Sequence, residues 1–142
     1  MKKIPIYVLD TSVIVKPVLE EQGSDIVCEI FQRKENYGLT VFVPEFFSFE
    51  FLNAVKRGKN AMIALEAYKA FMARQVCVIP FEEDLIKKTL AIVKKYPRAS
   101  YYDSAFHALA KAYKVDLVTA DKKYYQMTKK EGDVVLLEDL KL

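Results

Sequence analysis

Short apolar runs alternate with amphipathic segments along the whole chain. The first run, residues 4–9, ends at Asp10 and is typical of a strand that is buried on both faces. Similar runs predict further strands over residues 40–43, 76–79, 117–119 and 134–137. Between the runs, apolar residues recur at helical spacing, which predicts helices over residues 24–34, 44–57, 60–74, 83–95, 102–113 and 122–129. Strands that alternate with helices indicate the α/β class, with a central parallel sheet of about five strands covered on both faces.

Residues at the ends of the predicted helices support these boundaries. Ser24 precedes a segment with helical periodicity and is predicted to cap its N-terminus. Pro44 is predicted to start a helix that Gly58 ends, because proline suits a first helical position and glycine suits the position after a helix. Asn60 is predicted to cap the helix that follows.

The composition is that of a folded globular protein. The 142 residues predict a single domain, 1–142. Hydrophobic residues make up 52% and charged residues 29% of the chain, which excludes a disordered polymer. The net charge of +3 is mildly basic, so it permits a nucleic-acid partner without requiring one.

The lengths of the apolar segments, the N-terminal sequence and the cysteines predict a cytoplasmic protein that does not enter a membrane. No segment approaches the ~20 apolar residues that a membrane-spanning helix needs, and the N-terminus lacks a signal-peptide pattern. Cys28 and Cys77 lie in apolar stretches and are predicted to be small buried hydrophobic residues. They suggest no disulfide framework, which fits a reducing compartment.

Four acidic residues lie in apolar surroundings: Asp10, Glu50, Asp103 and Asp121. A carboxylate beside a buried strand or helix face is costly unless it is paired or binds a metal. Asp10 and Asp121 follow predicted strands, and parallel sheets bind ligands at the carboxyl ends of their strands. Clustered carboxylates repel one another, and a hard divalent cation relieves that repulsion. The pattern therefore predicts a Mg²⁺ or Mn²⁺ site that acts on phosphate esters.

Each acid taken alone has an ordinary structural explanation. Asp10 could form a turn or cap a helix, and Asp121 could cap the short helix after it. Glu50 could face solvent, although its many phenylalanine neighbours leave that helix little polar surface. Asp103 could be a favourable charge in the first turn of a helix. The metal-site hypothesis depends on all four acids together, in this order and in these contexts.

The four acidic segments resemble motif blocks of a known family. They read VLDTSVIVK over 8–16, PEFFSFEFLNAV over 44–55, YDSAFHALA over 102–110 and LVTAD over 117–121. In this order and spacing they resemble PIN domains, and especially the VapC-type toxin ribonucleases. The resemblance extends over the whole chain.

This resemblance implies a PIN-like α/β/α sandwich in which Asp10, Glu50, Asp103 and Asp121 converge on one or two Mg²⁺ or Mn²⁺ ions. It implies an endoribonuclease that hydrolyses RNA and leaves a 3′-hydroxyl and a 5′-phosphate. It also implies a small antitoxin protein as a partner, and a homodimer.

The resemblance also assigns supporting residues. Thr11, Ser12 and Asn53 match polar positions that support the acids, and Thr119 matches the hydroxyl residue before the last acid.

Basic residues near the acidic segments are candidates for contacts with an RNA backbone. Lys16, Arg98 and Lys122 are the predicted substrate-binding residues, and Arg57 is also close in sequence to an acid. Surface charges with no such role are the ordinary alternative for each of them. His107 shares a helix face with Asp103 and could be a general base, but a packed or surface histidine is the default expectation.

Three alternatives to a toxin ribonuclease stay open. A housekeeping RNA-processing nuclease would carry the same acids. A catalytically silent domain that binds RNA or protein would fail to bind metal. An unrelated phosphotransfer fold is disfavoured, because a dehalogenase-type phosphatase needs an aspartate where Ser12 stands and a receiver domain needs acids where Lys2 and Lys3 stand.

Overall fold

The protein is described here by a computed structural model of residues 4–142, so residues 1–3 of the predicted domain lie outside the described part. Five strands form one sheet in the order β3-β2-β1-β4-β5, and every neighbouring pair is parallel. Their bounds are β1 Ile6–Leu9, β2 Thr40–Pro44, β3 Cys77–Ile79, β4 Asp116–Thr119 and β5 Val134–Leu136. The predicted α/β fold with a parallel sheet of five strands is therefore confirmed.

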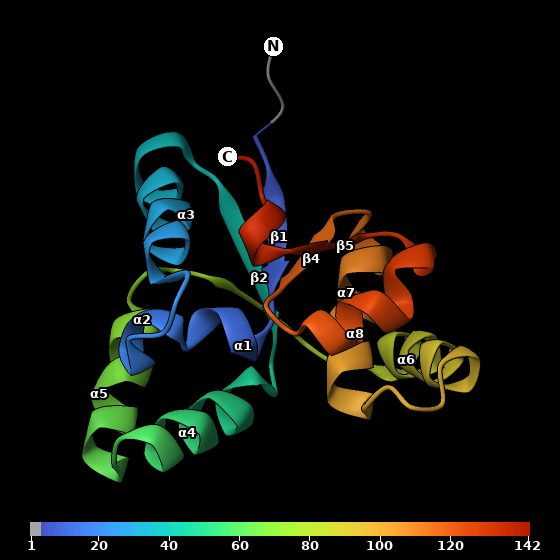
Figure 1. Ribbon diagram of the computed structural model, residues 1–142, viewed down its shortest axis with the longest axis horizontal. Coiled ribbons are helices and arrows are strands. Elements are labelled where there is room, and N and C mark those ends of the chain that lie inside the picture. The colour runs from blue at the N-terminus through green and yellow to red at the C-terminus, as the bar shows by residue number, and fades with distance from the viewer. Residues whose placement is uncertain (1–3) are drawn as a thin grey trace.

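Helices cover both faces of this sheet. On one side lie α1 Thr11–Ile14, α2 Lys16–Leu19, α3 Ser24–Tyr37, α4 Phe47–Gly58 and α5 Ala61–Met72 (Figure 1). On the other side lie α6 Glu83–Lys95, α7 Tyr101–Tyr113 and α8 Lys122–Thr128 (Figure 1). Two 3₁₀ turns, η1 Lys129–Glu131 and η2 Leu137–Asp139, flank β5. This arrangement follows from right-handed crossovers between parallel strands, which place the helices of successive connections above or below the sheet.

The second half of the central strand, β1, is deeply buried. In β1, Val8 and Leu9 have no exposed surface, while Ile6 and Tyr7 are partly exposed. Burial on both faces, predicted for the whole run, therefore holds for its second half. Val8 pairs with Leu117 of β4 on one side and with Phe42 of β2 on the other. The strand that precedes Asp10 is thus fixed between two neighbours, and so is the position where the chain leaves the sheet.

Two predicted helix starts were wrong. Pro44 does not start a helix: it pairs with Ile79 at the end of β2, and the next backbone N–H, from Glu45, donates to the Ile79 carbonyl oxygen at 3.0 Å. The sheet continues past the proline, and α4 begins only at Phe47. Ser24 is not a cap either, because its hydroxyl donates to the carbonyl oxygens of two earlier residues and Gly23 takes the N-cap position with φ +98°.

Other local predictions were correct. The Asn60 side chain accepts a hydrogen bond of 2.9 Å from the backbone N–H of Ile63, as expected of a cap. The helix predicted over residues 83–95 has those bounds. The four-residue helices α1 and α2 were missed, because a segment of one turn is too short to show helical periodicity.

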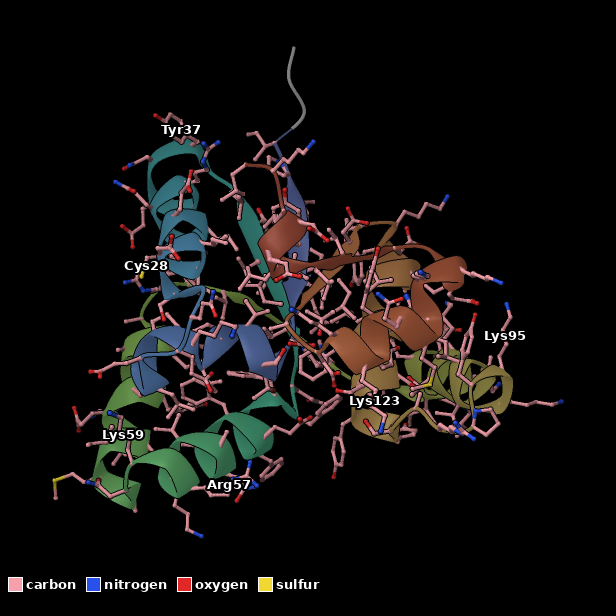
Figure 2. The ribbon with its side chains drawn as sticks, in the orientation of Figure 1. Cys28, Tyr37, Arg57, Lys59, Lys95 and Lys123 are labelled. Atoms are coloured by element: carbon pink, nitrogen blue, oxygen red, sulfur yellow. The ribbon has the colours of Figure 1, made fainter. Side chains whose placement is uncertain are left out.

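Both cysteines are exposed, so the prediction that they are buried was wrong. Cys28 projects from the outer face of α3 (Figure 2), and Cys77 lies on β3, an edge strand of the sheet. Apolar neighbours in sequence do not settle burial where an element has only one covered face. Within residues 4–142, no helix is both long and apolar enough to cross a lipid bilayer.

Candidate functional site

The sheet topology brings the ends of β1 and β4 together. Leu9 pairs with Val118, and the backbone N–H of Asp10 donates to the Val118 carbonyl oxygen at 3.3 Å. Asp121 follows two residues after β4 ends at Thr119. Because neighbouring parallel strands end at the same edge, Asp10 and Asp121 lie on one rim of the sheet.

Glu50 and Asp103 reach this rim from opposite faces of the sheet. Glu50 lies in the first turn of α4, and Asp103 lies in the first turn of α7. Figure 1 shows α1 and α4 on one side of the strand ends, and α7 and α8 on the other. All four acids line one open cleft of about 560 Å³. Its charged lining residues are Asp10, Glu21, Glu50, Asp103, Asp121, Lys16 and Arg57.

The Asp10 carboxyl is the most deeply buried of the four. Only 5% of the residue is exposed, and burial raises its pKa to about 6 against an opposing hydrogen bond from Ser12. The Ser12 hydroxyl donates to Asp10 and accepts a hydrogen bond of 3.0 Å from the backbone N–H of Ala120. Ser12 therefore connects the acid after β1 to the segment after β4.

Glu50 and Asp103 are also held in a setting that disfavours their charged forms. Burial, together with the nearby charges of Asp103 and Asp10, raises the pKa of Glu50 to about 7. One carboxyl oxygen of Glu50, Oε1, is buried and has no hydrogen-bond partner. Burial also raises the pKa of Asp103, with a smaller contribution from Asp121 and an opposing hydrogen bond from Ser100.

Asp121 has a structural role in addition to its place in the cleft. Its Oδ1 accepts a hydrogen bond of 2.9 Å from the backbone N–H of Tyr124, so it caps α8. Its own backbone N–H donates to the Thr119 hydroxyl at 3.1 Å. The capping alternative and the place in the cleft therefore both hold for Asp121, and the cap fixes the direction of its side chain.

The predicted supporting residues differ in their positions. Thr11, Ser12 and Asn53 line the cleft. The Thr11 hydroxyl is buried without a hydrogen-bond partner, which leaves it free to bind a water or a ligand. Thr119 is fully buried beneath the cleft and acts on it through its bond to the Asp121 backbone.

The three predicted substrate-binding cations do not lie together. Lys16 lines the cleft, whereas Lys122 lines a neighbouring pocket and pairs with Glu138 at 3.5 Å. Arg98 is exposed in the connection between α6 and α7 and does not line the cleft. Arg57, which was not among the three, does line it. Figure 2 shows Arg57 on α4 and Lys123 on α8, the helices on either side of the cleft.

His107 is a packed structural residue and does not reach the cleft. It is fully buried, and its Nε2 lies 2.7 Å from the Gly132 carbonyl oxygen, which can only accept. Nε2 therefore carries the proton, and Nδ1 accepts from the Tyr124 hydroxyl at 2.8 Å. Burial lowers the pKa of His107, which favours this neutral form. The histidine ties α7 to α8, the two helices that carry Asp103 and Asp121.

The carboxylate oxygens of the four acids are the kind of ligand that a hard divalent cation prefers. The side chains would, however, have to move closer together to bind the same ion. Between residues 4 and 142, none of the four acids pairs with a lysine or arginine. The raised pKa values of Asp10, Glu50 and Asp103, together with the unpartnered Glu50 oxygen, mark uncompensated negative charge. As they stand, no three acidic, His or Cys side chains of this described part are close enough to ligate a single ion.

Comparison with known proteins identifies the family. The sequence matches the PIN domain family over residues 7–130, so the chain belongs to that family. No curated protein matches the chain in sequence.

Solved structures with the same fold include toxins of toxin–antitoxin pairs. VapBC2 of Rickettsia felis, solved with a DNA fragment from its promoter, superposes with a TM-score of 0.68 at 16% identity and covers 92% of this chain and 96% of that one. VapC20 of Mycobacterium tuberculosis, a toxin that cleaves the sarcin–ricin loop, gives a TM-score of 0.67 at 12% identity. The match covers 85% of this chain and 95% of VapC20. A toxin–antitoxin complex from Klebsiella pneumoniae gives a TM-score of 0.67 at 14% identity, and the match covers 94% of this chain and 99% of the matched chain. At such identities the likeness establishes the fold.

Proposed function

We propose that this PIN domain is a metal-dependent endoribonuclease and the toxin of a VapBC-type toxin–antitoxin pair. One observation carries the catalytic part of the proposal. Four acids from four separate segments line one cleft, and no cationic side chain of residues 4–142 pairs with them. Proteins avoid such an arrangement unless a ligand of opposite charge offsets it.

Asp10, Glu50 and Asp103 are the residues proposed to hold Mg²⁺ or Mn²⁺, because burial and mutual repulsion raise their pKa values. Asp121 completes the site with the oxygen that does not cap α8. A bound divalent ion supplies positive charge for the phosphate and acidifies a water molecule. Whether one or two ions bind depends on how far the carboxylates move.

The chain's own residues prepare the site for an RNA strand. Ser12 donates to Asp10 and thereby holds one carboxyl oxygen in a fixed direction. The α8 cap holds Asp121 in the same way. Lys16 and Arg57, at the wall of the cleft, contact backbone phosphates on either side of the scissile bond. These contacts offset the repulsion between the phosphates and the acids.

The proposed partners are a small antitoxin protein and a second copy of the chain. The complexes from Rickettsia felis and Klebsiella pneumoniae contain toxin and antitoxin, which supports the first partner. Exposed apolar side chains on α4 and α5 offer a surface for either partner, and the largest exposed fractions are those of Phe49, Met62 and Leu65. Co-purification with the product of an adjacent small gene tests the antitoxin, and molar mass in solution tests the dimer. A housekeeping nuclease would lack that adjacent gene.

A second candidate function is a PIN domain that binds RNA without cutting it. The observation in its favour is that no three ligand side chains of residues 4–142 are within reach of one ion as they stand. The two functions differ in whether metal binds at all, and metal titration distinguishes them.

The test is cleavage of a mixed pool of end-labelled RNAs by the wild type and Asp103→Asn, with Mn²⁺ and with a chelator. We expect cutting by the wild type only with metal. We expect a loss of more than about 100-fold in the variant, because losing even an indirect metal contact costs about 10- to 100-fold. Asp84→Asn, at an exposed position on α6, is the matched control and should cut normally. Equal cutting by wild type and Asp103→Asn would refute the assignment.

A further inference from the structure

A second pocket lies beside the acidic cleft and has no role in the site described above. It is about 370 Å³ in volume and shares the lining residues Lys16 and Ala120 with the cleft, so the two hollows adjoin each other. The N-terminal turn of α3 forms one wall, and Leu136 at the end of β5 and Leu137 just after it form another. We name it the Leu137 pocket.

The backbone at Gly23 shapes this pocket. Gly23 has φ +98°, a conformation that other residues rarely adopt. A Cβ there would lie 3.2 Å from Leu137 Cδ2 and 3.4 Å from Lys16 Cδ. The missing side chain thus lets the aliphatic stem of Lys16 and the Leu137 side chain approach the α3 turn. Lys16 is held at the junction, where it lines both hollows.

The lining of the Leu137 pocket suits a group that is partly apolar and partly polar. Ile26, Leu136 and Leu137 supply apolar surface, and Gln22 supplies an amide that can both donate and accept hydrogen bonds. Lysines at positions 16 and 122 are balanced here by acids at positions 25 and 138, so the pocket is close to neutral. The acidic cleft, by contrast, has five acids and two cations among its lining residues.

We propose that the Leu137 pocket holds the nucleobase of the nucleotide next to the scissile phosphate. Lys16, which lines both the pocket and the acidic cleft, would contact the backbone phosphate of that nucleotide. This inference rests on the proposed ribonuclease function and adds a substrate subsite to it. Its volume is at the small end of ligand pockets, which span about 300–1,000 Å³, so it suits one nucleotide. A base placed there would pack against the aliphatic side chains of Ile26, Leu136 and Leu137, and its edge could hydrogen-bond to the Gln22 amide.

Methyl NMR tests this proposal without requiring cleavage. Asp103→Asn, labelled at Ile, Leu and Val methyl groups, is titrated with single-stranded hexanucleotides of each base and with an abasic hexamer of equal charge. We expect shifts at Ile26, Leu136 and Leu137 with at least one base-containing oligomer and none with the abasic one. Methyl groups of Val15 and Leu19, which line the acidic cleft, report strand binding as such.

Protein variants add a second arm. Gln22→Ala should weaken binding of the preferred oligomer about three- to tenfold, since one hydrogen bond contributes about 1 kcal/mol. Gln126→Ala, on an exposed face of α8 outside both hollows, is the matched control and should bind like the parent. Equal affinities of Gln22→Ala and its parent would overturn the assigned contact.

The outcomes separate this proposal from the proposed function. If the wild type cuts RNA while the three pocket methyls stay silent, or shift equally with the abasic oligomer, the nucleobase subsite is wrong and the nuclease stands. If the pocket methyls respond to bases but the wild type cuts nothing with Mn²⁺, the nuclease is wrong; the base-binding pocket then stands, but its place beside a scissile phosphate does not. If the pocket methyls do not shift with any oligomer and the wild type does not cut RNA, both the nucleobase subsite and the nuclease assignment are wrong.

Discussion

Replacing Glu50 by glutamine should stabilise the metal-free protein at neutral to alkaline pH. The ordinary pKa of this carboxyl is 4.5, and burial with the charges of Asp103 and Asp10 raises it to about 7 in the folded state. An acid with a raised pKa binds more protons when folded than when unfolded. Stability is therefore highest below the ordinary pKa and falls as the pH rises through about 7.

The size of the effect follows from that pKa difference. At about 1.4 kcal/mol for each pH unit, the rise to about 7 corresponds to about 3 kcal/mol at pH 8. Because the Glu50 side chain is partly exposed to water, we halve this to about 1.5 kcal/mol. For a domain of this size, Glu50→Gln should then raise the melting temperature by about 5 °C at pH 8. The gain should shrink toward zero below about pH 4.5.

Thermal unfolding of wild type and Glu50→Gln from pH 4 to pH 8, with chelator, measures this difference. Glu66→Gln is the matched control: Glu66 is exposed on α5 in an ion pair with Lys69, so its loss should change stability by less than about 0.5 kcal/mol. With millimolar Mn²⁺ the order should reverse, because metal stabilises the wild type by binding its native state. Parallel pH curves for wild type and Glu50→Gln would refute the raised pKa of Glu50, and with it the burial and repulsion that cause it.

Three further substitutions test the supports around the site. Tyr124→Phe leaves the buried Nδ1 of His107 without its donor and should cost about 1–3 kcal/mol in urea unfolding, whereas Tyr125→Phe should cost little. Asn60→Ala removes the side-chain acceptor at the start of α5 and should cost about 1 kcal/mol in the same assay; no change would mean that this cap is dispensable. Ser12→Ala removes the donor to Asp10 and the acceptor of the Ala120 N–H, so it should lower both the melting temperature and the rate of metal-dependent RNA cleavage; an unchanged rate would mean that Ser12 does not orient Asp10.

The fold could be predicted because its signals are local. Five apolar runs and the helical spacing between them are properties of neighbouring residues, and parallel strands follow from their alternation with helices. Of the exceptions, one has a local cause and the other depends on a contact distant in sequence. The one-turn helices α1 and α2 are too short to show a period, and β2 extends through Pro44 because the Glu45 N–H bonds to Ile79 of the next strand.

The candidate site was less predictable, because its geometry joins segments distant in sequence. The sequence indicated which acids are unusual, but only the structure decides that Glu50 and Asp103 reach the strand ends from opposite faces of the sheet. Among the predicted cations, it places Lys16 in the cleft and Arg98 outside it. Closeness in sequence to an acid does not decide which way a helix or a loop turns a side chain.

The amino-acid sequence alone thus determined the class of fold, the order of its strands and longer helices, and the four acids, since these depend on periodicity and on the cost of burying charge. Tertiary structure alone decided the electrostatics of Asp10 and Glu50, the role of His107 and the shape of the Leu137 pocket. The physical reason is distance: burial, repulsion and hydrogen bonds act over a few ångströms in space, whatever the separation along the chain.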